Sequence, residues 1–146
     1  MTILRLVQKT DLQALLTLYT YLGDNPIPQD RDKLACCWQT LLSDERTSII
    51  LAQTADQVVS TCTLTVILNL THDLRPYGFI ENVVTLPAYR KQGLAGQCLA
   101  EAVRIAQAQN CYKVLLTTGS KRPETLNFYR NAGFNDLDKT AFVRWL

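Results

Sequence analysis

The stretch "PAYRKQGLAG", residues 87–96, combines two basic side chains with two glycines, between an apolar run and an alanine-rich segment with helical spacing. Where a turn leads into a helix, the first backbone N–H groups of the helix have no partners and lie at the positive end of its dipole. Gly93 and Gly96 allow a ligand to approach the backbone, and Arg90 and Lys91 add positive charge. The turn is therefore a candidate phosphate or pyrophosphate site, with a solvated helix cap as the alternative.

Other ligand signatures are absent from the sequence. It contains no G-x-x-x-x-G-K-[ST] phosphate loop, and the glycine spacing near residue 93 is not the G-x-G-x-x-G of a dinucleotide site. One histidine and five cysteines without a C-x-x-C pair provide no metal ligand set. We therefore expect no metal, and we expect the cysteines to be core thiols in a reducing compartment.

Two further side chains could move protons. Glu81 interrupts the apolar run "FIENVV", and strand alternation predicts that it faces the same way as Val83 and Thr85. Because carboxylates are rarely buried without a partner, we expect Glu81 to reach a cavity where it binds or deprotonates an amine. An edge position paired with arginine or lysine is the alternative. His72 in the polar loop 71–76 could act as a base through water, and simple solvent exposure is its alternative.

The elements that hold these residues follow from the periodicity of the apolar positions. Two β-branched runs separated by "TAD" predict an antiparallel hairpin, and a strand-helix-strand order around the glycine turn predicts a right-handed parallel crossover. Thr10 is expected to cap the first helix, and "VLL" to form a strand covered on both faces. Strands are expected at 2–8, 47–53, 57–70, 77–86, 112–117 and 140–146, and helices at 11–22, 30–43, 93–109 and from Pro123 to Gly133.

Composition limits the class of protein. The chain has 146 residues, of which 47% are hydrophobic and 19% charged, and its net charge is +2. These values predict one globular domain over residues 1–146. The charge is too small and too scattered for a general nucleic-acid binder. No apolar run is long enough for a membrane span and the first residues lack a signal-peptide core, so we expect a cytoplasmic protein without membrane partners.

Three segments together resemble a known family. "ENVVTLPAYRKQGLAG", residues 81–96, resembles motif A of the GCN5-related N-acetyltransferases, with the pattern [RQ]-x-x-G-x-[GA] at Arg90, Gly93 and Ala95. "LRLVQKTDLQALLTLY" is similar to the family's first strand and helix. "TLNFYRNAGF", residues 125–134, is similar to its motif B. The matches occur in the family's order and extend over most of the chain.

The resemblance implies a fold, a cosubstrate and site residues. The fold is α/β (α+β), a single mixed and mostly antiparallel twisted sheet of about 6–7 strands flanked by about four helices. The cosubstrate is acetyl-coenzyme A. Tyr129 matches the general acid that protonates the departing thiolate, with a packed aromatic as the alternative. The pyrophosphate is expected at Arg90, Lys91, Gln92, Gly93, Leu94, Ala95 and Gly96, and the pantetheine arm along Val83, Val84 and Thr85.

These observations lead to one functional hypothesis and its rivals. We expect direct acetyl transfer to a primary amine, with Glu81 or a water chain beside it taking the amine proton. "IENVVTLPAYR" and "CYKVLL" resemble the glucosamine-6-phosphate N-acetyltransferase branch, but "TTGSKRPE" stands where that branch has acidic residues. The rivals are a non-catalytic acyl-coenzyme A sensor and an enzyme that acetylates peptides. Phe142 and Trp145, in a possible pairing strand, also suggest a homodimer.

Overall fold

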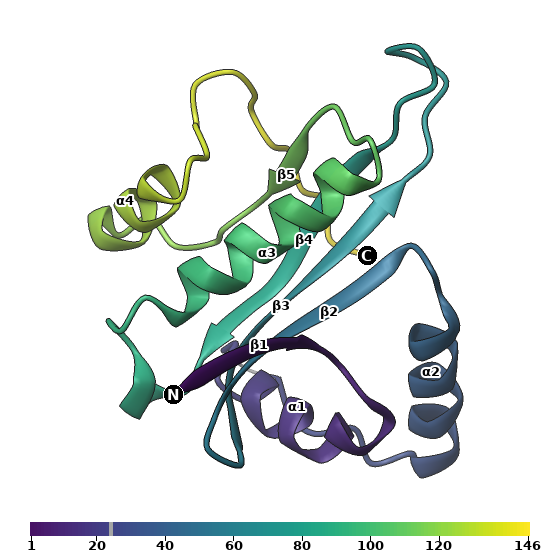
Figure 1. Ribbon diagram of the computed structural model, residues 1–146, viewed down its shortest axis with the longest axis vertical. Coiled ribbons are helices and arrows are strands. Elements are labelled where there is room, and N and C mark those ends of the chain that lie inside the picture. Colours follow the sequence, from purple (N-terminus) through teal and green to yellow (C-terminus); the bar gives the residue numbers. More distant parts are fainter. Residues whose placement is uncertain (24) are drawn as a thin grey trace.

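The computed structural model describes residues 1–23 and 25–146, which form a five-stranded sheet covered by helices on both faces (Figure 1). Along the chain the strands are β1 (Thr2–Leu6), β2 (Thr47–Thr54), β3 (Gln57–Ile67), β4 (Tyr77–Thr85) and β5 (Val114–Leu116). The helices are α1 (Leu12–Tyr19), α2 (Arg31–Ser43), α3 (Leu94–Ala108) and α4 (Pro123–Asn131). None of the helices in these ranges is long and apolar enough to cross a membrane.

The strands lie in their order along the chain, β1-β2-β3-β4-β5. Strands β1 to β4 are antiparallel to their neighbours, and β5 joins β4 in parallel through the α3 crossover. The register of β3 against β4 shifts between Thr61 and Thr63, and Asn82 in β4 has a φ of +55°. These two features mark a β-bulge, which inserts an extra residue and bends the strand.

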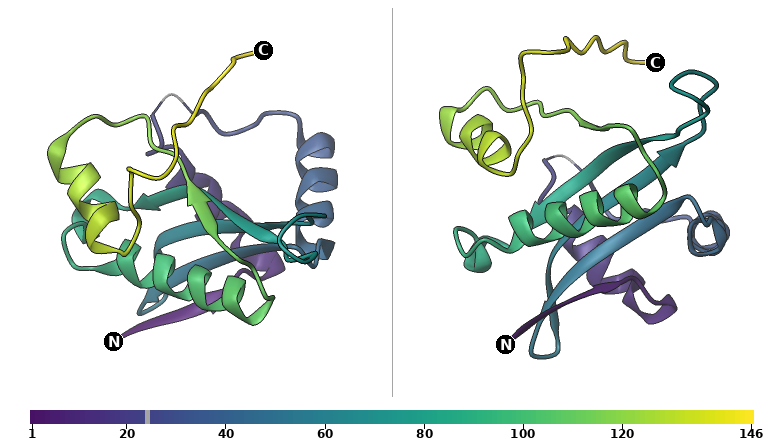
Figure 2. Two further views of the ribbon diagram at one scale, coloured as in Figure 1. Left: turned by 90° about the horizontal axis from the view of Figure 1, so that it is seen from above. Right: turned by 45° about the horizontal axis from the view of Figure 1, so that its top comes forward.

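Two hydrophobic clusters hold the sheet between its helices. Figure 2 shows the sheet and its helices from two further directions. The first joins the sheet to α3 and continues to half-buried side chains of α4; the second joins the opposite face to α1 and α2. Alternation places neighbouring residues of one strand in different clusters, so Ile50 belongs to the first and Ile49 to the second. Trp38 of α2 closes the second cluster and donates its indole N–H to the carbonyl of Lys9 at 3.1 Å.

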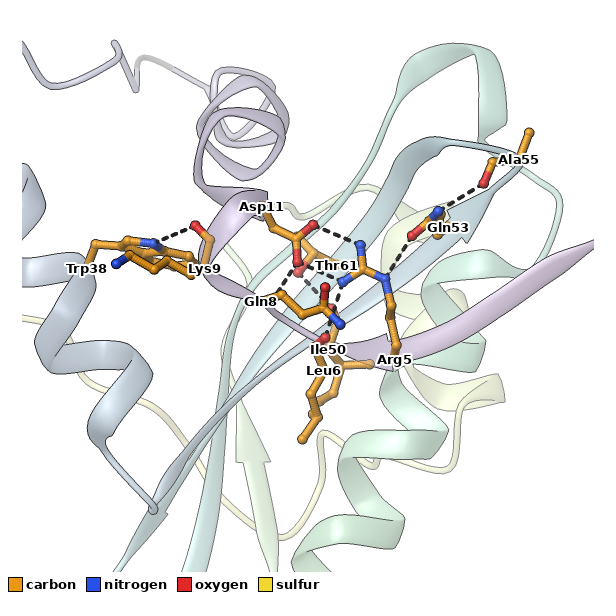
Figure 3. Close-up of polar contacts among 10 residues, drawn as sticks. All are labelled: Arg5, Leu6, Gln8, Lys9, Asp11, Trp38, Ile50, Gln53, Ala55 and Thr61. Atoms are coloured by element: carbon orange, nitrogen blue, oxygen red, sulfur yellow. Dashed lines mark hydrogen bonds and ion pairs between the residues drawn. The ribbon is translucent and has the colours of Figure 1, made fainter.

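An ion pair ties the first strand to the start of α1 (Figure 3). The Arg5 guanidinium donates to both carboxylate oxygens of Asp11 at 2.7 and 2.8 Å, and its Nε donates to Gln53 at 2.8 Å. The backbone N–H of Gln8 donates to the same carboxylate at 2.6 Å. The expectation that Thr10 caps the first helix is therefore wrong, because a short 3₁₀ turn, Lys9–Asp11, precedes α1 and the Asp11 carboxylate organises it.

Some of the other sequence-based expectations are confirmed and others are wrong. The mixed sheet, the four helices, the hairpin and the parallel crossover are confirmed, with helix α4 beginning at Pro123. The expectation of 6–7 strands is wrong, since the described residues form five, and residues 140–146 are neither strand nor helix. Strand β5 has only three residues, and all are half-buried rather than covered on both faces. A strand needs a neighbour to accept its backbone hydrogen bonds, and residues 140–146 have none within the described chain.

Candidate functional site

An open strand edge lies where β4 and β5 separate. Their pairing begins at Gly78 with Val114 and ends at Ile80 with Leu116, although β4 continues to Thr85. On its other edge, β4 stays paired with β3 as far as Thr85. Residues 81–85 therefore present one edge that no described strand covers. Such an edge offers backbone donors and acceptors to an extended, amide-containing ligand.

The glycine turn follows directly from this edge. A 3₁₀ turn, Pro87–Tyr89, leads through Lys91 (φ +61°) and Gly93 (φ +77°) into α3, which begins at Leu94. No side chain caps the helix at Gly93, and within the described chain no protein acceptor takes the backbone N–H groups of residues 91–96. A Cβ at Gly93 or Gly96 would meet no protein atom within 4 Å. The space in front of these N–H groups is therefore free for an anion.

The basic side chains of the turn are exposed. Nε of Arg90 donates to the carbonyl of Thr85 at 3.2 Å, which folds the side chain back across the turn. Gln92 makes a long contact, 3.4 Å, from its Nε2 to the carbonyl of Ala88. The Thr85 hydroxyl is buried 2.7 Å from the Ser60 hydroxyl. Arg90 can thus offer its terminal nitrogens to a ligand, whereas Thr85 has only backbone groups to offer.

The structure corrects the expected orientation of Glu81. In the register Glu81 lies opposite Thr63, whose side chain is beside Tyr19 of α1, so Glu81 is on the α1 side of the sheet. Val83 instead packs against the cluster on the α3 side. The bulge at Asn82 breaks the alternation between the two, so they do not face the same way. Glu81 is also exposed rather than buried, because β5 has already diverged from β4 at this point.

Tyr129 lies on α4 and is half-buried against the α3-side cluster. Its ring is 4.9 Å from that of Phe128, and its backbone carbonyl accepts the N–H of Phe134 at 3.1 Å. Burial raises the pKa of the Tyr129 phenol, and Cys62 and the negative charge of Glu81 raise it further. The phenol of Tyr129 therefore keeps its proton at neutral pH.

Neither buried cysteine near the site is a ready nucleophile. Burial raises the pKa of Cys98 to about 11 and that of Cys62 further still. Only a thiolate attacks an acyl group efficiently, so both thiols are inert near neutral pH. Cys62, Cys98 and Cys111 are buried as expected, but Cys36 and Cys37 are exposed on α2, which contradicts the expectation that all five are core thiols.

A cavity of about 270 Å³ lies on the α1 side of the bulge. Tyr19 and Asn82 bring polar groups to it, and burial raises the pKa of the Tyr19 phenol. Its other lining residues are Leu16, Asn25, Pro26, Ile27 and Pro28. Sequence reasoning missed this cavity because Tyr19 continued the apolar face of a helix. Asn82 was the available signal, since asparagine inside a strand pattern tolerates the left-handed backbone of a bulge.

His72 lies away from these groups, in the loop before β4, whereas the glycine turn follows the other end of that strand. Its ring stacks on Tyr112 at 3.8 Å, and its Nδ1 is 2.9 Å from the Thr71 hydroxyl. The structure does not bring His72 together with Glu81 or Tyr129. The candidate site therefore comprises the open edge, the turn, Tyr129, Glu81 and the cavity.

Comparison with known proteins identifies this arrangement. The sequence profile of the Acetyltransferase (GNAT) family matches residues 10–134. A glucosamine 6-phosphate N-acetyltransferase of Trypanosoma brucei brucei is 30% identical over 137 residues, covering 90% of this chain and 87% of that protein.

Solved structures of acetyltransferases have the same fold as this chain. A putative acetyltransferase from Agrobacterium tumefaciens str. C58 is 35% identical, with a TM-score of 0.90, over 98% of this chain and 99% of its own. AAC(6')-Iy in complex with the bisubstrate analogue CoA-S-monomethyl-acetylneamine shares the fold, with a TM-score of 0.81 at 18% identity over 100% and 99% of the two chains. The chain belongs to the GNAT family of acetyl-coenzyme A-dependent acetyltransferases and is an N-acetyltransferase.

Proposed function

We propose that this protein transfers an acetyl group from acetyl-coenzyme A directly to the primary amine of a small molecule. The observation that carries the proposal is the continuity of two backbone surfaces: the open β4 edge at residues 81–85 runs into the unbonded N–H groups of residues 91–96. A single extended ligand with amides at one end and a diphosphate at the other matches both surfaces.

The residues present fit acetyl-coenzyme A. Its pyrophosphate is assigned to the backbone from Arg90 to Gly96, where positive φ values at Lys91 and Gly93 turn successive N–H groups toward one point. The terminal nitrogens of Arg90 and the ammonium of Lys91 add charge. The pantetheine arm is assigned to the backbone of Val83, Val84 and Thr85, because two of these side chains are buried in the protein. The bound cosubstrate supplies an activated thioester acetyl group.

The chain's own groups then account for the proton movements. Backbone N–H groups of the open edge near Val83 and Val84 stabilise negative charge on a carbonyl oxygen. Tyr129 holds a proton at its hydroxyl for the departing thiolate, and its raised pKa keeps that proton in place. Glu81 is an exposed carboxylate that can take the amine proton directly or through water. The inert thiols of Cys62 and Cys98 support transfer without a covalent enzyme intermediate.

The cavity beside Asn82 supports a small acceptor rather than a peptide. Its volume of about 270 Å³ is near the lower end of the range of roughly 300–1,000 Å³ for small-molecule sites. Hydroxyl and amide groups of Tyr19, Asn25 and Asn82 suit a polar ligand. An amino sugar or its phosphate is the first candidate, since a relative of that activity is 30% identical. The segment "TTGSKRPE" lacks the acidic residues that the branch has at this place, so this departure argues against an amino sugar and other small amines belong in the test.

An acceptor screen tests this proposal. The chain is mixed with acetyl-coenzyme A and amino sugars, amino-sugar phosphates, polyamines, amino acids or peptides, and release of free thiol is followed. We expect turnover with a small amine and strongest with an amino-sugar phosphate. Turnover with peptides alone would overturn the small-molecule assignment. Tight cosubstrate binding by calorimetry without turnover for any amine would favour the sensor. The single domain, cytoplasmic location and dimer remain predictions.

A further inference from the structure

A groove lies on the α1 side of the sheet, apart from the candidate site. It has a volume of about 760 Å³ and lies between α1, the hairpin of β2 and β3, and the 3₁₀ turn Pro87–Tyr89. It shares no lining residue with the cavity beside Asn82, here called the acceptor cavity. Its volume falls within the range of roughly 300–1,000 Å³ for small-molecule sites, and the proposed acetyl transfer does not use it.

Side chains joined by hydrogen bonds form one wall of the groove (Figure 3). Asp11 is only 7% exposed and accepts two hydrogen bonds from the Arg5 guanidinium, whose Nε donates to Gln53. The Gln53 amide in turn donates to the carbonyl of Ala55 at 3.0 Å. Arg5 also donates to the carbonyl of Leu6, which leaves one of its five N–H groups without a partner in the described chain. The wall is therefore held in place before any ligand binds, and it still offers a donor.

The charge of the groove favours a cation. Arg5 and Asp11 neutralise each other, whereas no basic side chain of the described chain forms an ion pair with the Asp56 carboxylate. Tyr21, which is 46% exposed, and Tyr89 border the same space, and aromatic faces attract organic cations. The other polar side chains of the lining carry hydroxyls or amides, which pair with hydroxyl groups of a ligand.

The elements that line the groove also hold the candidate site. Thr17 of α1 lines the groove, whereas Tyr19 of the same helix lines the acceptor cavity. Tyr89 lines the groove and donates its hydroxyl to Gln57 of the hairpin at 3.1 Å. It directly precedes Arg90, where the backbone assigned to the pyrophosphate begins. A ligand in the groove therefore contacts the turn that positions the N–H groups of the cosubstrate site.

We propose that this groove is a regulatory site for a small organic cation with hydroxyl groups, and that its occupation raises the affinity for acetyl-coenzyme A. The cationic group of the ligand pairs with Asp56, and its hydroxyls bond to Arg5 and Gln57. A ligand bound between the hairpin and the 3₁₀ turn restricts the turn, so the turn loses less conformational entropy when the cosubstrate binds. The coupling rests on the proposed cosubstrate site, whereas binding in the groove does not.

Amide NMR spectra of the isotope-labelled chain, titrated with millimolar glucosamine, test binding in the groove without acetyl transfer. Glucosamine is an amine with several hydroxyl groups. We expect it to shift the amide signal of Gln57, which lies apart from the Asn82 signal of the acceptor cavity. Thr17→Trp fills the groove from an exposed position and should weaken binding at Gln57 about tenfold or more. Gln13→Trp is the control, because Gln13 is exposed on α1 and lines neither site. A Gln57 signal that does not respond, or responds equally in both variants, would overturn the site.

The charge of Asp56 is tested in the same titration, with glucose as the neutral match of glucosamine. Asp56→Asn should weaken glucosamine binding about threefold, as expected for a charge contact near the surface. Asp73→Asn removes another exposed carboxylate, in the loop before β4, and should bind like the parent. Equal affinities of the parent for glucosamine and glucose would contradict a site for a cation, as would an unchanged affinity of Asp56→Asn for glucosamine.

Calorimetry with coenzyme A, which cannot be turned over, measures the coupling. Saturating glucosamine should raise the affinity of the parent for coenzyme A about fivefold, and coenzyme A should raise the affinity for glucosamine by the same factor. The affinity of Thr17→Trp for coenzyme A should not respond to glucosamine. An unchanged affinity of the parent, or a response that persists in Thr17→Trp, would overturn the regulatory role of the groove. A parent that does not bind coenzyme A at all would instead contradict the proposed function.

Discussion

Ile80 and Val84 are four residues apart in β4, yet their side chains enter opposite hydrophobic clusters. Ile80 belongs to the cluster on the α3 side, and Val84 packs with α1 and α2. In a regular strand, residues four apart face the same way. The bulge at Asn82 reverses this relationship, opens the β4 edge beyond Ile80 and directs Asn82 into the cavity.

The backbone of Asn82 is the first target for a test. Asn82→Val places a β-branched residue at a φ of +55° and should lower the free energy of unfolding by about 1–3 kcal/mol. Asn82→Gly accepts this φ and should stay within about 1 kcal/mol of the parent. The glycine variant still lacks the side-chain amide, so its KM for the acceptor should rise about tenfold, which corresponds to about 1.4 kcal/mol. Urea unfolding and steady-state kinetics check both values, and equal stability of the two variants would argue against a strained bulge.

The pair of Arg5 and Asp11 should make stability depend on pH. The hydrogen bonds from Arg5, and that from Gln8, lower the pKa of Asp11 below its ordinary value of 3.8. A carboxyl with a lowered pKa in the folded state stabilises the protein above its ordinary pKa, and this contribution is lost as pH falls through the folded-state pKa. Asp11→Asn leaves Arg5 without its charged partner and should lower the free energy of unfolding by about 3 kcal/mol at pH 7.

The difference in the free energy of unfolding between Asp11→Asn and the parent should shrink below about pH 4, where the Asp11 carboxylate of the parent also becomes protonated. Asp136→Asn is the matched control, because it removes the carboxylate of an equally close arginine pair that is exposed to solvent. Ion pairs that are exposed to solvent contribute little to stability, so the unfolding curve of Asp136→Asn should stay close to that of the parent. Chemical unfolding from pH 2 to 7 compares the three proteins. A difference in the free energy of unfolding between Asp11→Asn and the parent that does not change with pH would contradict the role of the ion pair.

The sequence predicted what depends on local patterns. Apolar periodicity located the four helices, and the composition of "PAYRKQGLAG" located the turn before α3. The sequence could not predict on which face of the sheet Glu81 lies, because alternation assumes a regular strand and the bulge at Asn82 depends on pairing with β3. The cavity beside Tyr19 also escaped, since it forms only where α1 meets β4. The segment 140–146 has strand composition, but composition does not supply the neighbouring strand that a strand needs, and the described chain offers none.

Gly93 should control cosubstrate affinity. Gly93→Val places a branched side chain at a φ of +77° and into the space in front of the free N–H groups of the turn. Acetyl-coenzyme A affinity should fall at least tenfold, or about 1.4 kcal/mol, by calorimetry. Gly23→Val is the control for backbone strain, since Gly23 has a similar φ of +79° and an equally open Cβ position but lies after α1. A similar loss of affinity in both variants would show that strain, rather than the turn, is responsible.

Tyr129→Phe removes the proposed proton donor and leaves the ring that packs against the α3-side cluster. Folding and cosubstrate affinity should hardly change, while kcat falls by about 10²-fold, the lower part of the range for losing a general acid because water can partly replace the phenol. Burial raises the pKa of Tyr129 above its ordinary value of 10.0. Activity that needs the protonated phenol is lost only as pH rises through that raised pKa, so the defect should persist unchanged from pH 7 to 9. Tyr77→Phe, which alters a tyrosine at the far end of β4, is the control and should keep the parent rate. A parent-like kcat for Tyr129→Phe, measured at saturating acetyl-coenzyme A where the chemical step limits the rate, would leave Tyr129 as a packed aromatic residue only.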